Sequence, residues 1–179
     1  DVTYSPHFPS DASVIAELYP QAGGQPVDGV IAIDPKGLAA LLQLTGPVTV
    51  DGLDEPLSAT NAVEILTRSQ YLDLGDRTAR GEVLAAATKA TFEKLVNSAL
   101  PAPRALAETL SPAARGGHLR LWSPEPGEQD LFERLGADGS LAIPAGSDGF
   151  SLIQQNAGNN KIDAYLERSI NYHPTIDVD

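Results

Sequence analysis

One strand–helix–strand pattern constrains the fold more than any other feature of the chain. Residues 28–34 are short, apolar and β-branched, as in a buried strand. Asp34 and Pro35 supply an N-cap and a first helical position, and Gly46 ends the helix. The apolar face of this helix carries Leu38, Leu41, Leu42 and Leu44. With residues 48–50 as a second strand, the pattern predicts a βαβ-like unit and a mixed α/β fold, a sheet flanked by helices.

The strand–helix–strand pattern predicts which residues are buried, and residues 48–50 also allow a second interpretation. The strand should lie beneath the helix, with Val30, Ile31 and Ile33 buried under Leu38, Leu41 and Leu42. Alternatively, residues 48–50 form one arm of a hairpin over the loop 51–56.

Capping residues, glycines and prolines mark the other expected elements. Helices are expected at residues 11–22, after a cap at Ser10 or Asp11, and at 58–72, 77–100, 102–114 and 126–135. Strands are expected at 118–122, 140–143, 150–154 and 161–172. Two adjoining rows of side chains run along helix 77–100. One row is Leu84, Thr88, Thr91 and Leu95, and the other is Phe92, Val96 and Ala99.

The segment 161–172 alternates strictly between two faces, which is typical of a half-exposed strand. One face carries Ile162, Ala164, Leu166, Ile170 and Tyr172, and only Arg168 interrupts its apolar character.

The charge of the chain excludes one class of partner. Twelve Lys+Arg against 24 Asp+Glu give a formal net charge of −12. Binding to a phosphate backbone needs clustered basic residues, so no nucleic-acid partner is expected. No apolar run reaches the roughly 18 residues of a membrane span, so membrane contact is expected only through a segment outside this chain.

Most polar motifs favour structural roles. The chain has no cysteine, which excludes zinc–thiolate sites and thiol nucleophiles. His7, His118 and His173 have no metal-ligating spacing, the acidic loop 51–55 matches no calcium cage, and residues 156–161 are typical of a tight turn. The sequence predicts no catalytic residue, no metal site and no cofactor.

An arginine cluster is the strongest candidate for ligand binding. Arg68, Arg77 and Arg80 lie close together in an otherwise acidic chain. Arg77 and Arg80 are three positions apart at a predicted helix start, where guanidinium groups and free N–H groups together suit an anion such as pyrophosphate. The alternative is structural, with Asp76 capping the helix and pairing with Arg80.

Four ordered motifs resemble a known family. They are YSPHFPS at residues 4–10, VDGVIAIDP at 27–35, LTGPVTV at 44–50 and QNAGNNKID at 155–163. In this order they resemble domain-of-unknown-function family 4012, large exported proteins common in actinobacteria, and the resemblance spans nearly the whole chain. It implies an upstream membrane helix and further extracytoplasmic sequence. The absence of methionine and the start at Asp1 agree with a piece of a longer protein.

A weaker likeness runs to the LytR-CpsA-Psr family, which transfers cell-wall polymers from polyprenyl carriers. That family has a layered α/β fold and an R-x-x-R-Q sequence at a helix start. Here Arg77 resembles its pyrophosphate-binding arginine, while Gly81 stands in place of the glutamine. The likeness implies a phosphotransferase acting on polyprenyl-pyrophosphate-linked glycans, with magnesium needed only under this alternative.

We therefore expect residues 1–179 to form a single domain of a longer extracytoplasmic protein, on the cell surface or anchored to the membrane. The expected role is a non-catalytic binding or scaffold module. Its expected partner is a cell-wall glycan or an envelope protein.

Overall fold

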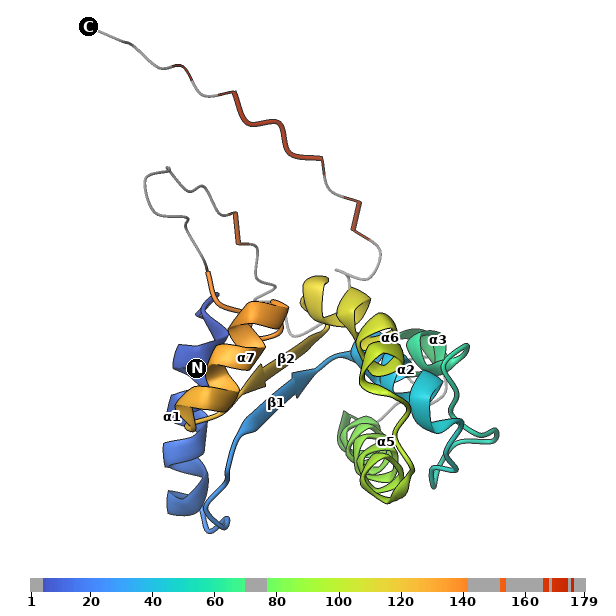
Figure 1. Cartoon of the computed structure of the whole chain (residues 1–179). Helices are drawn as coiled ribbons and strands as arrows, with labels where there is room; N and C mark the ends of the chain where they lie inside the picture. Colours follow the sequence, from blue (N-terminus) through green and yellow to red (C-terminus); the bar gives the residue numbers. More distant parts are fainter. Residues whose placement is uncertain are drawn as a thin grey trace, which may run out of the picture.

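A two-stranded antiparallel sheet separates two groups of helices (Figure 1). The computed structural model describes residues 5–69, 77–141, 152–153, 166–167, 169–173 and 175. In chain order the elements are α1 (Phe8–Gln21), β1 (Val30–Ile33), α2 (Pro35–Thr45), α3 (Ala62–Glu64), the π-helical segment η1 (Ile65–Ser69), α5 (Arg77–Asn97), α6 (Pro103–Arg115), β2 (Leu119–Trp122) and α7 (Pro126–Leu135). The predicted mixed α/β fold is confirmed.

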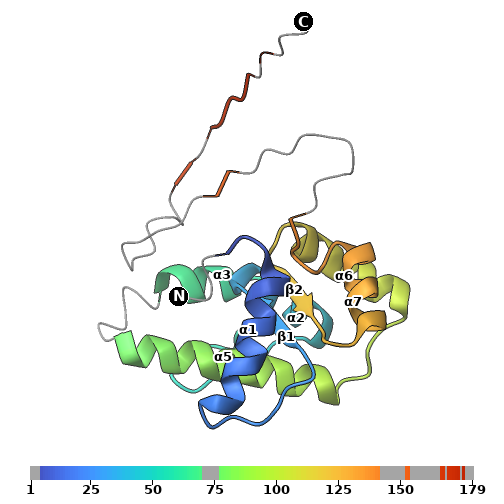
Figure 2. The same ribbon diagram turned by 90° about the vertical axis from the view of Figure 1, so that its left-hand side faces the viewer.

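The sheet pairs segments that are distant in sequence. Val30 lies opposite Trp122, and Ile33 lies opposite Leu119. Helix α1 packs against both strands and crosses in front of them in Figure 2, while α2 and α6 pack together on the other side.

The predicted βαβ unit is wrong, and the hairpin alternative is confirmed. Gly46 ends α2 with a φ of 79°, a left-handed conformation that glycine adopts without strain. Val48 then forms an antiparallel bridge with Leu57, with two N–H···O bonds of 2.8 Å. Both side chains are buried, so burial of apolar surface against α2 holds the hairpin there instead of returning the chain to β1.

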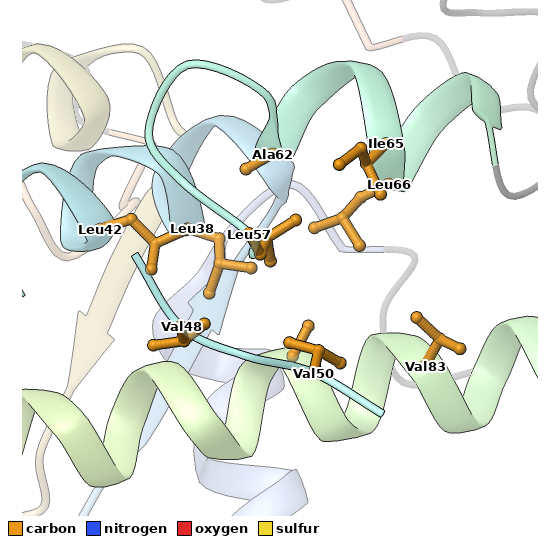
Figure 3. Close-up of a cluster of buried hydrophobic side chains, with 10 residues drawn as sticks. Leu38, Leu42, Val48, Val50, Leu57, Ala62, Ile65, Leu66 and Val83 are labelled. Carbon is orange, nitrogen blue, oxygen red and sulfur yellow. The ribbon is translucent and has the colours of Figure 1, made fainter. Parts of the chain in front are cut away.

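The main core lies between α2, this hairpin, α3 with η1, and α5 (Figure 3). Its buried members are Leu38, Leu42, Val48, Val50, Leu57, Ala62, Ile65, Leu66, Val83 and Ala87. The core includes the predicted Leu38 and Leu42, and Leu41 is buried as well. In contrast, Ile31 is 49% exposed, so the prediction that it is buried is wrong. Val30 and Ile33 are half-buried.

The row that helix α5 turns toward the core shares only Thr91 with the predicted rows. Val83, Ala87 and Thr91 are buried, and Thr91 Oγ1 donates to the Ala87 carbonyl at 2.8 Å. Leu84 and Phe92, from the two predicted rows, are exposed. The small side chains on the buried row let α5 approach α2 closely, which a row of leucine and phenylalanine would prevent.

Local capping sets most helix ends where the sequence predicts them. Asp34 Oδ1 accepts the N–H groups of Lys36 and Gly37, and α7 ends at Gly136 with a φ of 64°. One start differs: His7, not Ser10 or Asp11, caps α1, because its Nδ1 accepts the Ser10 N–H.

The C-terminal strand predictions lie mostly outside the described residues. Residues 140–141 belong to no strand, and the rest of 140–143 is not described. Within 150–154, only residues 152–153 are described, and they too belong to no strand. Of residues 161–172, the described positions 166–167 and 169–172 are exposed and carry no strand assignment. Among the helices of the described ranges, none is both long enough and apolar enough to cross a bilayer.

Candidate binding groove

An open groove of about 530 Å³ lies between α2 and α6. Its lining is small and apolar at Ala39, Ala40 and Ala113, where the two helices pack together. Polar side chains also line it: Lys36, Gln43, Glu108, Thr109 and His118. The groove therefore combines an alanine surface with hydrogen-bonding groups of both charges.

One rim residue is held by a neighbour on the same helix. Arg104 Nε donates to Glu108 Oε1 at 2.8 Å, an i,i+4 pair on α6 with both side chains well exposed. An exposed pair of this kind contributes little to stability, but it orients the carboxylate beside the groove.

A carboxylate–imidazole pair lies beside the same groove. Asp34 Oδ2 is 2.6 Å from His118 Nδ1, with the side chains 45% and 29% exposed. The Asp34 N–H also donates to the His118 carbonyl at 3.2 Å. Asp34 therefore joins the start of α2 to the start of β2 through its backbone and through its side chain.

This pair leaves one ring nitrogen of His118 available. With Nδ1 bonded to the carboxylate, Nε2 has no hydrogen bond to any residue that the structure describes. A histidine held in this way can offer Nε2 to a ligand as an acceptor, or as a donor once it is protonated. Thr109, the hydroxyl-bearing residue of the groove lining, donates its hydroxyl to the Ala105 carbonyl at 3.0 Å. The arrangement therefore suits binding better than nucleophilic chemistry.

Replacing Asp34 by alanine should lower the free energy of unfolding by about 0.5–2 kcal/mol, because the N-cap bonds of α2 are lost. Asp34→Asn keeps an oxygen that can accept the Lys36 and Gly37 N–H groups and should cost less. Urea denaturation of both variants measures the difference. Equal losses would show that the cap is not what Asp34 contributes.

The arginine cluster stays a prediction. Arg68 lies in η1, and Arg77 and Arg80 lie in the first turn of α5. The side chains of Arg68 and Arg77 are outside the described residues, as is Asp76. Arg80 is half-buried, and its side chain or backbone already has an interaction partner. Their convergence on an anion is therefore neither confirmed nor contradicted.

The other sequence candidates behave mainly as structural features. His7 caps α1, and three of the five residues of loop 51–55 are exposed acidic side chains. No group of three His, Cys, Asp or Glu residues that could hold a metal occurs within the described ranges. His173 is exposed, and residues 156–161 lie outside the description.

The local sequence marks Asp34 only as a helix cap and His118 only as the start of a strand. The two residues are 84 positions apart. No spacing rule connects them, because their contact depends on the pairing of β1 with β2.

Comparison with known families supports one of the two resemblances. Residues 1–71 match the family described as "Protein of unknown function (DUF4012)". The DUF4012 resemblance is confirmed over this range. The DUF4012 match covers α1, β1, α2, the hairpin, α3 and η1, and it includes Asp34 and three of the four motifs. The fourth motif, at residues 155–163, lies beyond it.

The comparisons with curated proteins and with solved structures give no information on function. No curated protein and no solved structure matches the chain. The likeness to the LytR-CpsA-Psr family is therefore not shown, and the description of the DUF4012 family names no function.

Proposed function

We propose that this chain is an extracytoplasmic cell-envelope domain that acts as a non-catalytic binding or scaffold module. The observation that supports this proposal is the open groove between α2 and α6, with its alanine surface and polar rim. An open groove leaves a ligand in contact with water, which suits reversible binding, whereas catalysis generally needs a site that excludes water.

The polar groups of the groove favour a neutral, hydroxyl-rich ligand. Lys36 and Glu108 supply opposite charges, while Gln43, Thr109 and His118 supply neutral donors and acceptors. A net charge of −12 repels polyanions such as phosphate-rich wall polymers. A neutral stretch of cell-wall glycan is the partner with the best match to both features.

Titration of the isotopically labelled full chain with soluble peptidoglycan fragments tests this proposal. We expect amide shifts at Gln43, Thr109 and His118. Gln43→Ala should weaken binding about 2- to 10-fold, the usual effect of one lost hydrogen bond.

Gln21→Ala is the matched control, because it removes the same amide group from the end of α1, outside the groove. Its affinity should equal that of the wild type. Absence of shifts in the groove at millimolar fragment would exclude the glycan proposal.

The alternative is an enzyme of LytR-CpsA-Psr type, and one feature favours it: Arg77 and Arg80 lie together in the first turn of α5. We expect no heat on calorimetric titration with geranyl pyrophosphate and magnesium, because Gly81 stands where that family has glutamine. Binding by the wild type that Arg77→Ala abolishes, with unchanged melting temperature, would contradict this expectation and favour the enzyme.

A further inference from the structure

A pocket of about 260 Å³ lies where the start of β1, the end of β2 and the first half of α7 meet. We call it the α7 pocket. Figure 1 shows α7 beside the sheet and away from α2 and α6. The α7 pocket shares no lining residue with the groove between α2 and α6, so it does not depend on the function proposed for that groove. Its volume suits a group the size of one side chain and is below the range for drug-sized ligands.

Two carboxylates line the α7 pocket, from Asp28 and Glu128, and none of its described lining residues is basic. Both residues are exposed, so a ligand can reach them from solvent. The Asp28 carboxylate forms no hydrogen bond or ion pair with any residue in the described part of the chain. Two like charges without a counter-ion attract a cation to this pocket.

A buried serine holds one of these carboxylates in place. Ser123, which is 4% exposed, donates its hydroxyl to Glu128 Oε2 at 2.8 Å. The same hydroxyl oxygen accepts the Glu125 N–H at 3.1 Å, and the Ser123 N–H donates to Gln129 Oε1 at 3.1 Å. Glu128 Oε1 has no hydrogen bond to a residue that the structure describes. The carboxylate is therefore oriented through one oxygen, and its other oxygen is available to a ligand.

The rest of the pocket wall is largely apolar and partly aromatic. Ile31 is 49% exposed, and Trp122 and Phe132 are half-buried. The faces of aromatic rings attract cations, and apolar side chains cover the aliphatic stems of long charged groups. A bare metal ion would make no use of this wall, and the described residues contain no group of three His, Cys, Asp or Glu that could hold one.

We propose that the α7 pocket binds a primary alkylammonium group, as carried by a lysine side chain or by a free alkylamine. The ammonium group lies between the carboxylates of Asp28 and Glu128. Its aliphatic stem lies along Ile31, Trp122 and Phe132. Because both carboxylates are exposed, water and salt screen the attraction, so the dissociation constant for a single ammonium group falls in the millimolar range.

NMR titration of the labelled full chain with n-butylammonium at low salt tests this proposal. We expect shifts of the Trp122 indole N–H and of the Ser123 and Glu128 amides. n-Butanol has the same stem without the charge, and methylammonium has the charge without the stem. Each should bind at least about fivefold more weakly than n-butylammonium. Equal or tighter binding by either compound, or shifts that avoid the α7 pocket, would overturn the proposal.

Nα-Acetyl-lysine methylamide distinguishes the two sources of the ammonium group. Affinity equal to that of n-butylammonium would assign the pocket to a lysine side chain of a polypeptide. Binding of n-butylammonium without binding of the blocked lysine would assign it to a free alkylamine, because the peptide backbone would then be what the pocket rejects.

Asp28→Asn combined with Glu128→Gln should weaken binding of n-butylammonium about tenfold, because both charges are lost. Glutamine at position 128 keeps an oxygen that can accept the Ser123 hydroxyl, so the melting temperature should change little. Asp130→Asn combined with Glu133→Gln is the matched control, since it removes two charges from α7 outside the pocket lining. Its affinity should stay within about twofold of the wild type. Equal losses in the two double variants would overturn the proposal in favour of a general effect of net charge.

Discussion

Replacing Leu42 by alanine should lower the free energy of unfolding by about 2–5 kcal/mol, the range for a fully buried leucine. Leu42 is 1% exposed and lies where α2 meets the hairpin and α5 (Figure 3). The truncated side chain would leave a cavity in the main core, whose other members come from α2, the hairpin, α3 with η1, and α5. Because these side chains are held by different segments, we expect the cavity to stay largely unfilled. Urea denaturation gives the difference.

Leu18→Ala is the matched control, because Leu18 is 45% exposed on α1 and alanine favours a helix at least as well. Its effect should stay below about 1 kcal/mol. A loss below about 1 kcal/mol for Leu42→Ala would contradict the position of the core.

Gly37→Ala should destabilise the protein by about 1–3 kcal/mol or more, even though alanine is the better helix former. A Cβ at Gly37 would overlap the carbonyl oxygen of His118 and would come within 2.8 Å of Ile33 Cγ1. The oxygen is a backbone atom that also accepts the Asp34 N–H, so relief of the overlap requires α2 and β2 to separate.

Gly81→Ala makes the same chemical change where a Cβ meets nothing within 4 Å. In the interior of α5 it should raise stability by about 0.5–1 kcal/mol, since glycine is the poorer helix former. Thermal and urea unfolding of the two variants should therefore shift in opposite directions. A stabilised Gly37→Ala variant would show that α2 and β2 do not approach closely.

Elements whose ends depend on neighbouring residues could be predicted well. α2 begins after Asp34 and ends before Gly46, and α7 covers the predicted residues 126–135. Both have a proline in the first turn and a glycine after the last, and these signals act within a few residues.

Features that depend on contacts between distant segments could not be predicted. Residues 48–50 have strand composition, but only tertiary packing decides between β1 and Leu57 as their partner. In α5, Val83 and Leu84 are both apolar, and the close approach of α2 selects the smaller one for the core. The groove and the Asp34–His118 pair arise from the same long-range packing, so no local motif marks them.

The main core limits where the polypeptide can be divided without loss of its fold. Eight of its ten buried members lie within residues 1–71, but Val83 and Ala87 of α5 cover the opposite side. β1 likewise needs β2, which ends at Trp122. A polypeptide cut at residue 71 would expose Val48, Val50 and Leu57 to water and leave β1 without a partner. We therefore expect that a piece able to fold on its own extends at least through β2, beyond residue 71, where the family match ends.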